Sequence, residues 1–301
     1  MRRASKFWFF VLRTFGKLPL RFHYFWGRFI AWFLKDVMHY RRSEVLINLS
    51  RSFPQLKYGK IVSIADDFYT HLGQIFVEAI WFSGCYHNPE RLRKQRIMEI
   101  ENQALMNQVY EDSSSVTVLT SHCGNWELFG GVCYYNFVED VPVIPKEKLR
   151  VVYKELTNKV SDEVFKKARP CPMEGFEGML ESNQILRHAL VHKDEKLAYY
   201  IVADQHPYQT PVLLDEPFLN QKTYGMLGTF KLAVKLHHAV MFAHILRKGR
   251  GHYVIRYEKM CDDASQFTPE QLMNQYFKIL EQDIIADPAN WLWSHRRWKK
   301  F

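Results

Sequence analysis

Hydrophobic and polar positions follow two different periods along this 301-residue chain. Short β-branched or aliphatic runs predict buried strands, and apolar residues three or four apart predict helices. The predicted strands are Val116–Thr120, Val141–Ile144, Val151–Tyr153, Ala198–Val202, Ala239–Leu246 and Tyr253–Tyr257. The predicted helices are Ser43–Phe53, Lys60–Phe82, Asn88–Tyr110, Leu156–Ala168, Leu180–Leu190, Thr229–His237 and Pro269–Ile285.

Alternation of strands and helices is typical of α/β proteins with a buried, largely parallel sheet. We therefore expect an α/β/α sandwich with a mostly parallel central sheet, preceded by N-terminal amphipathic helices. No repeat or linker divides residues 85–301. The expected organisation is a terminal segment, residues 1–40, followed by one α/β domain, residues 41–301.

The segment after Pro19 has the period of an amphipathic helix. One face carries the aromatic residues Phe22, Phe25, Trp26, Phe29 and Phe33, and another side carries Arg21, Arg28 and Lys35. This pattern is typical of a helix that lies in a membrane surface, with rings in the acyl boundary and cations toward phosphates. A helix docked on the protein's own core is the alternative, and the two can hold together.

The charge distribution favours the membrane interpretation. Residues 1–60 contain thirteen Lys or Arg against only Asp36 and Glu44, so the net charge of +9 comes entirely from this part. Basic residues also interrupt every apolar stretch before it is long enough to span a bilayer. Nucleic acid is the competing partner, but apolar bulk dominates this segment, so we expect a membrane surface and no nucleic acid.

The cysteines and histidines give no metal or disulfide signature. Five cysteines form no C-x-x-C pair, and His237, His238 and His244 lack the spacing of a ligand set. We expect no metal, and a reducing compartment is the default for such a chain.

Candidate chemistry follows the strand Val116–Thr120, because open α/β sheets place their sites at the carboxyl ends of strands. His122 lies in the expected turn and Glu127 in the first turn of the next helix. There the carboxylate could hold one imidazole nitrogen while the other accepts a proton from a hydroxyl. A histidine that only bonds the backbone is the alternative. Cys123 as a nucleophile is disfavoured, because adjacent residues on an extended chain point to opposite faces.

The motif His122-Cys123-Gly124-Asn125-Trp126-Glu127 resembles the signature of the bacterial lipid A biosynthesis (lauroyl/myristoyl) acyltransferases, in the glycerophosphate/lysophospholipid acyltransferase superfamily. The similarity extends over nearly the whole chain. Its further blocks occur in the family's order, namely Tyr40-Arg41-Arg42 with Asn48-Leu49, Phe68-Tyr69 through Glu78, Val152–Asn158, Ala203-Asp204-Gln205, Phe218–Thr223 with Gly228, Ala239-Val240 with Arg247, and Trp293–Lys299.

This resemblance implies an O-acyltransferase of the inner membrane's cytoplasmic face. It implies transfer of a fatty acyl chain from an acyl thioester, on acyl carrier protein or coenzyme A, to a hydroxyl of a lipid A precursor. No other cofactor is implied. His122 would be the general base, oriented by Glu127. An acceptor of another kind, such as a lysophospholipid or aminoacyl lipid, and a non-catalytic membrane-binding protein are the alternatives.

The same resemblance suggests substrate-binding residues. Backbone N–H groups near Gly124 and Asn125, or the Lys154 ammonium, are candidate donors to the oxyanion, and Asn125 is also a candidate helix cap. Many relatives have arginine in place of Lys154, which leaves the acceptor and chain length open.

Asp204 and Gln205 are candidate polar groups of the site, with a loop or capping role as the alternative. Arg247 is a candidate for acceptor phosphates or for an acidic carrier protein, and a solvated surface role is its alternative.

Overall fold

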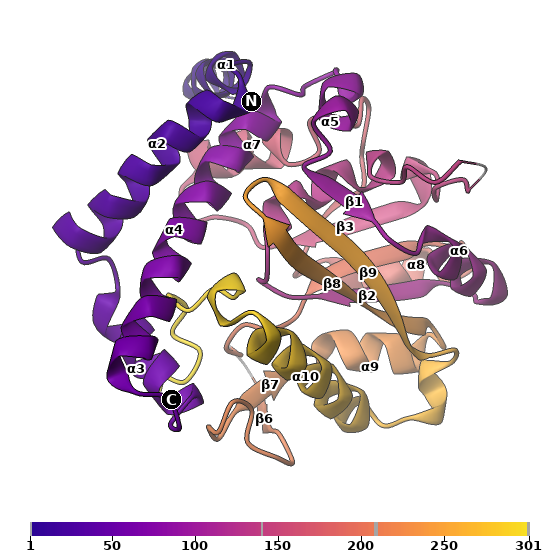
Figure 1. The fold of residues 1–301 in the computed structure, drawn as a ribbon. Coiled ribbons are helices and arrows are strands. Elements are labelled where there is room, and N and C mark those ends of the chain that lie inside the picture. The colour runs from indigo at the N-terminus through magenta and orange to yellow at the C-terminus, as the bar shows by residue number, and fades with distance from the viewer. Residues whose placement is uncertain (1, 140, 208–209, 300–301) are drawn as a thin grey trace.

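The computed structural model describes residues 2–139, 141–207 and 210–299, and its centre is a seven-stranded sheet (Figure 1). The strand order is β1-β9-β8-β2-β5-β3-β4. β8 and β9 pair antiparallel, and the other neighbouring pairs are parallel. The strands are β1 (Met98–Ile100), β2 (Val116–Thr120), β3 (Leu149–Tyr153), β4 (Met179–Glu181), β5 (Ala198–Val202), β8 (Ala239–Gly249) and β9 (His252–Cys261). The expected mostly parallel α/β sheet is confirmed.

Helices cover both faces of this sheet. They are α1 (Arg3–Gly16), α2 (Leu20–Trp32), α3 (Arg42–Ser52), α4 (Tyr58–Ser83), α5 (Pro89–Gln95), α6 (Gln103–Asp112), α7 (Lys159–Ala168), α8 (Ile185–Val191), α9 (Gly228–Lys235) and α10 (Pro269–Ala286). A π-helical turn (Phe33–Val37), short 3-10 helices such as η2 (Trp126–Tyr134), and a two-stranded ribbon of β6 (Pro211–Leu213) and β7 (Tyr224–Met226) complete the described elements.

Alternate residues of the central strands enter different cores, as expected for a sheet buried on both sides. Leu119 and Phe242 pack with apolar residues of α3, α4, α9 and α10. Val118 and Met241 face the opposite core, which includes residues of α5, α6 and the end of α4. The sheet is therefore the middle layer of a sandwich.

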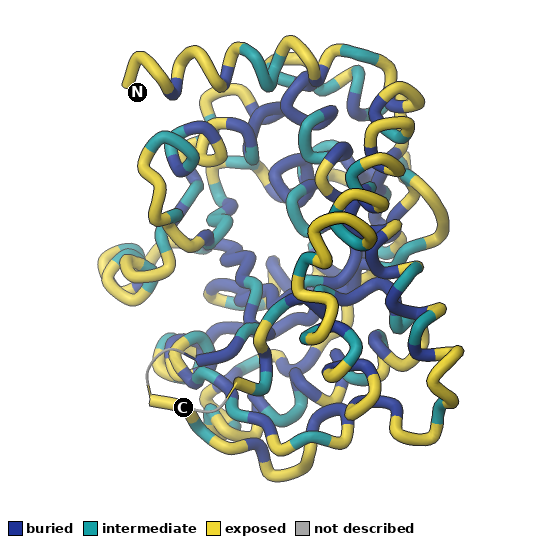
Figure 2. Tube along the Cα trace, turned by 90° about the vertical axis from the view of Figure 1, so that its left-hand side faces the viewer, coloured by how far each residue is buried: buried dark blue, intermediate teal, exposed yellow. Residues whose placement is uncertain are grey.

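Helix α2 lies along α4, and α1 packs against the C-terminal end of α4 and against α7 (Figure 1). Much of the outer side of both N-terminal helices is exposed (Figure 2). The side of α2 toward α4 carries small residues: Gly27 and Ala31 are buried, and a Cβ added to Gly73 of α4 would collide with the Gly27 carbonyl oxygen. On the outside, Phe25 is 69% exposed and Phe29 is 48% exposed. The helix thus docks on the protein by its small residues and leaves its aromatic residues uncovered.

Three predicted elements differ from the structure. Val141–Ile144 is not a strand, because Pro142 and Pro145 interrupt the N–H donors that a sheet ladder needs. The predicted helix Asn88–Tyr110 is divided into α5, β1 and α6, with Arg96 in the left-handed region at φ 48° between them.

The predicted helix Leu180–Leu190 begins later, at Ile185, because β4 precedes it. The two strands of the central sheet that the sequence does not predict, β1 and β4, are three residues long and lie at its two edges. The ribbon strands β6 and β7, also three residues long, are not predicted either. Strands that short show no clear hydrophobic period.

Candidate active site

Two parallel strands at the centre of the sheet bring the main site residues together. β2 pairs with β5 so that Thr120 lies opposite Val202. His122 is the second residue after Thr120, and Asp204 is the second residue after Val202. Because parallel strands end at the same edge of a sheet, the two side chains meet beyond that edge.

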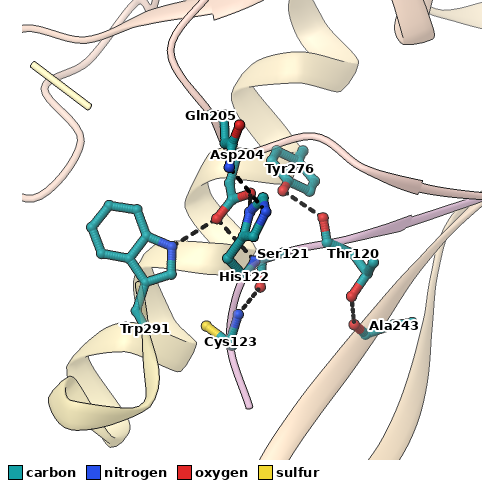
Figure 3. Close-up of polar contacts among 9 residues, drawn as sticks. All are labelled: Thr120, Ser121, His122, Cys123, Asp204, Gln205, Ala243, Tyr276 and Trp291. Atoms are coloured by element: carbon teal, nitrogen blue, oxygen red, sulfur yellow. Dashed lines mark hydrogen bonds and ion pairs between the residues drawn. The ribbon is translucent and has the colours of Figure 1, made fainter. Parts of the chain in front are cut away.

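Asp204 holds the imidazole of His122 (Figure 3). Its Oδ1 lies 2.6 Å from His122 Nδ1, and its Oδ2 accepts a hydrogen bond from the His122 backbone N–H at 3.0 Å. The indole N–H of Trp291 donates to the same Oδ2 at 2.7 Å. The carboxylate is 2% exposed, so these bonds replace its lost hydration.

The surroundings of Asp204 keep it ionised. Burial raises the pKa of the carboxyl, but the adjacent His122 and the hydrogen bonds from His122 and Trp291 outweigh burial and lower its pKa to about 2. A charged carboxylate at Nδ1 favours the imidazolium form of the ring when His122 takes up a proton.

Gln205 covers the other side of the same ring. Its Nε2 lies 3.0 Å from His122 Nε2 (Figure 3). An amide nitrogen only donates, so His122 Nε2 accepts and the ring proton is on Nδ1, toward Asp204. The ring edge also contacts Trp126, with centroids 4.8 Å apart, and the His122 side chain is 14% exposed. Nε2 therefore carries the free lone pair of the ring and is the nitrogen that can accept a proton.

The predicted contact between Glu127 and His122 is wrong for this structure. Glu127 lies at the start of η2, and its carboxylate accepts from Arg169 Nε at 2.8 Å and from Nη2 at 3.1 Å. The turn at Gly124, with φ 60°, redirects the chain before η2 begins. Asp204 therefore orients the imidazole, while Glu127 forms an ion pair with the residue that follows α7.

Two of the other predicted substrate-binding residues, Gly124 and Asn125, already make hydrogen bonds within the protein. The Gly124 N–H already donates to Asn290, at 3.0 Å to both the backbone oxygen and Oδ1, so it is occupied as an oxyanion donor. Asn125 donates to Glu78 at 2.8 Å and makes no capping bond, which corrects the capping alternative. Lys154 is exposed directly after β3.

Arg247 is engaged in a bidentate ion pair. Its Nε and Nη2 donate to the two carboxylate oxygens of Asp287 at 3.0 and 2.8 Å. A substrate phosphate or an acidic carrier protein would have to compete with this pair. The placement therefore favours a structural role over the predicted substrate contact.

Cys123 is unsuited to nucleophilic catalysis. It is 1% exposed, and burial raises the pKa of its thiol well above the usual range. A thiol nucleophile needs the thiolate form and access to substrate. The disfavoured thiol mechanism has no support in this geometry.

A family model of the bacterial lipid A biosynthesis acyltransferases matches residues 2–300. The chain belongs to this family. The resemblance read from the motifs is confirmed, and acyltransferase activity is what the family implies. No curated protein matches the chain at a significant level.

Family motifs far apart in the sequence are in contact. Arg41 donates to the carbonyl of Ser294 at 2.8 Å, and Asn48 donates to the carbonyls of Trp293 and His295 at 3.1 and 3.2 Å. These bonds fasten the segment that follows Trp291 to α3 and the turn before it. The C-terminal motif thus anchors the chain next to Trp291, whose indole N–H donates to Asp204. The sequence alone does not indicate this role.

Neither a spanning helix nor a metal cluster occurs in the part of the chain that the structure describes. None of the helices in 2–139, 141–207 and 210–299 combines the length and hydropathy needed to cross a bilayer. The same residues contain no group of three or more His, Cys, Asp or Glu arranged to hold a metal ion.

Proposed function

We propose that the enzyme is a membrane-associated O-acyltransferase that moves a fatty acyl chain from an acyl thioester, carried by acyl carrier protein, to a hydroxyl of a lipid A precursor. His122 is the general base and Asp204 orients it. The observation that carries this proposal is the pair of contacts on the His122 ring, which leave Nε2 as the proton acceptor. Family membership supports the acyl chemistry.

The reaction begins when the acceptor hydroxyl replaces Gln205 at His122 Nε2. Nε2 takes the hydroxyl proton as the oxygen attacks the thioester carbonyl carbon, and a tetrahedral oxyanion forms. Asp204 stabilises the imidazolium that results. Collapse of the intermediate breaks the carbon–sulfur bond, and the imidazolium returns its proton to the departing thiolate. An ester and a free thiol are the products, so atoms and charge balance without a covalent enzyme intermediate.

Donors for the oxyanion come from groups other than Gly124, whose N–H is occupied by Asn290. The Gln205 amide, once displaced from His122, offers N–H donors beside the reacting carbon. The Lys154 ammonium, at the end of β3 on the same edge of the sheet, is the second candidate. Glu127 takes no part in these steps, because its carboxylate is paired with Arg169.

The membrane surface is the proposed location of the acceptor. Exposed aromatic residues gather on the two N-terminal helices: Phe7, Trp8, Phe10, Phe15, Phe22, Phe25, Trp26, Phe29 and Trp32. The same segment holds the excess of basic residues, which suits the anionic phosphates of a cytoplasmic leaflet. This arrangement supports the proposal of a peripheral or monotopic attachment to the inner membrane.

An assay with defined substrates tests the function. Purified enzyme is mixed with vesicles and with acyl carrier protein that carries a labelled acyl chain. The acceptor is a lipid A precursor, a lysophospholipid or an aminoacyl lipid, each in a separate reaction. We expect an ester product with the lipid A precursor and none from His122→Ala, while the exposed-histidine control His252→Ala stays active. Product with another acceptor only would identify a different lipid substrate. No product with any acceptor would favour the binding-protein alternative.

A further inference from the structure

Glu78 is a buried carboxyl group in the apolar part of α4, and the mechanism above does not use it. Its side chain is 0% exposed. An isolated charge in such a position is costly, and buried carboxyl groups are therefore surrounded by hydrogen-bond donors. The donors around Glu78 come from three different parts of the fold.

Each donor is a neutral side chain. Tyr24 of α2 donates its hydroxyl to Glu78 Oε1 at 2.8 Å. Asn125 Nδ2 and the Tyr253 hydroxyl of β9 both donate to Oε2, at 2.8 and 2.9 Å. One carboxyl group therefore joins an N-terminal helix, a strand of the sheet and the turn that carries His122.

The close approach of α2 to α4 makes the Tyr24 bond possible. A Cβ on Gly27 would lie 3.0 Å from Val77 and 3.2 Å from the Gly73 carbonyl oxygen, so glycine lets the two helices touch. Tyr24 lies about one turn before Gly27, and Glu78 follows Val77 directly. The small-residue contact thus sets Tyr24 against Glu78.

The turn depends on Glu78 through Asn125. Asn125 is the third residue after His122, is 0% exposed, and its Oδ1 has no hydrogen-bond partner within the described part of the chain. Its bond to Glu78 is accordingly what fixes the orientation of this side chain. The neighbouring Gly124 N–H is held separately by Asn290.

The geometry points to Glu78 as a positioning residue that holds the His122–Asn125 turn in place against α2. The inference deepens the proposed function, since it rests on His122 acting as the base. It also gives α2 a second role, because this helix both offers aromatic residues to a membrane and forms part of the framework of the active site.

The charge state of Glu78 is linked to this network. Burial raises the pKa of Glu78 to about 7, against the opposing hydrogen bonds from Asn125, Tyr24 and Tyr253. The ionised group accepts all three bonds, whereas protonation turns one carboxyl oxygen into a donor, so that a tyrosine hydroxyl beside it would have to turn and accept. The other charged or titratable neighbours of the network are His71, beside Tyr253, together with Arg247 and Arg250.

Two conservative variants test the inference. Glu78→Gln removes the charge, and Tyr24→Phe removes one hydroxyl while keeping the ring. The matched controls are Glu90→Gln and Tyr58→Phe, both at exposed positions. We expect kcat to fall about tenfold or more in both test variants, with KM and vesicle binding unchanged, because small displacements of a catalytic group carry such costs. Both controls should behave as wild type.

Thermal unfolding gives a readout that does not depend on activity. A carboxyl whose pKa is raised on folding stabilises the protein below its unfolded value, and this contribution is lost as pH rises through the folded value. The Tm of wild type relative to Glu78→Gln should therefore fall between pH 4.5 and about 7 and level off above. If folding left the pKa of Glu78 unchanged, this difference would be independent of pH.

The outcomes separate the inference from the proposed function. An active wild type with unchanged kcat in Tyr24→Phe and Glu78→Gln would overturn the positioning role. If Glu78→Gln does not fold, the kcat of Tyr24→Phe alone decides. Absence of acyl transfer by wild type would refute the proposed function, whereas an active wild type with unchanged variants refutes the positioning role alone.

Discussion

Asp204 Oδ1 lies 2.6 Å from Nδ1 of His122, although 82 positions separate the two residues in the chain. The contact exists because β2 and β5 are parallel neighbours and each side chain follows its strand by the same interval. The pair has the parts of a base and its orienting carboxylate. Its surroundings lead to the following predictions.

Gln205→Glu should change the pH dependence of the reaction. Gln205 Nε2 is 3.0 Å from His122 Nε2, so the variant places a carboxylate beside the base. The negative charge stabilises the imidazolium, and the acid limb of kcat/KM should move to higher pH by about one unit. Gln55→Glu, at an exposed position, is the control. An acid limb that stays in place would mean that Gln205 does not face the base in solution.

Trp291→Phe should weaken the support of Asp204 while keeping an aromatic ring. The variant loses the indole N–H that donates to Asp204 Oδ2 at 2.7 Å. A hydrogen bond to a charged group contributes about 1.5–3 kcal/mol, so the free energy of unfolding should fall by about that amount and kcat should fall several-fold. Trp8→Phe, on the exposed side of α1, is the control. Urea unfolding and initial rates measure both effects, and wild-type values for the Trp291 variant would exclude a supporting role.

The aromatic surface of α2 should determine membrane affinity. Phe25→Ser combined with Trp26→Ser removes two exposed rings, and the partition coefficient onto phosphatidylglycerol-containing vesicles should fall about tenfold or more. Tyr58→Ser, 69% exposed on α4, controls for loss of an aromatic residue elsewhere. High salt should weaken wild-type binding without abolishing it. Equal binding of the double variant and wild type would rule out α2 as the contact surface.

Much of the sheet follows from local hydrophobic patterns. The predicted and observed bounds coincide for β2 and β5, because both are short runs of β-branched or apolar residues, fully or nearly fully buried at the centre of the sheet. The edge strands β1 and β4 cannot be predicted in this way, because three residues are too few to show a hydrophobic period. The opposite error is a predicted strand that does not form: the apolar run at Val141–Ile144 contains Pro142, which lacks the N–H donor that a strand needs.

The sequence predicts which residues form the site better than it predicts which of them are in contact. His122, Asp204 and Gln205 each follow a predicted strand, but sequence does not reveal which strands are neighbours, so Glu127 is the carboxylate that proximity along the chain favours. Packing decides the strand order and hence the partner of His122. A lone carboxylate within the apolar stretch around Glu78 is a further sequence signal, which indicates a buried polar group without naming its donors.

The rate of acyl transfer by Asp204→Asn tests the central claim most directly. The amide keeps the shape of Asp204 but neither favours the Nδ1–H tautomer nor stabilises the imidazolium, so kcat should fall by about 10³–10⁴-fold while vesicle binding is retained. Asp215→Asn, an exposed carboxylate, is the control. A folded Asp204→Asn enzyme with a rate near that of wild type would contradict the account.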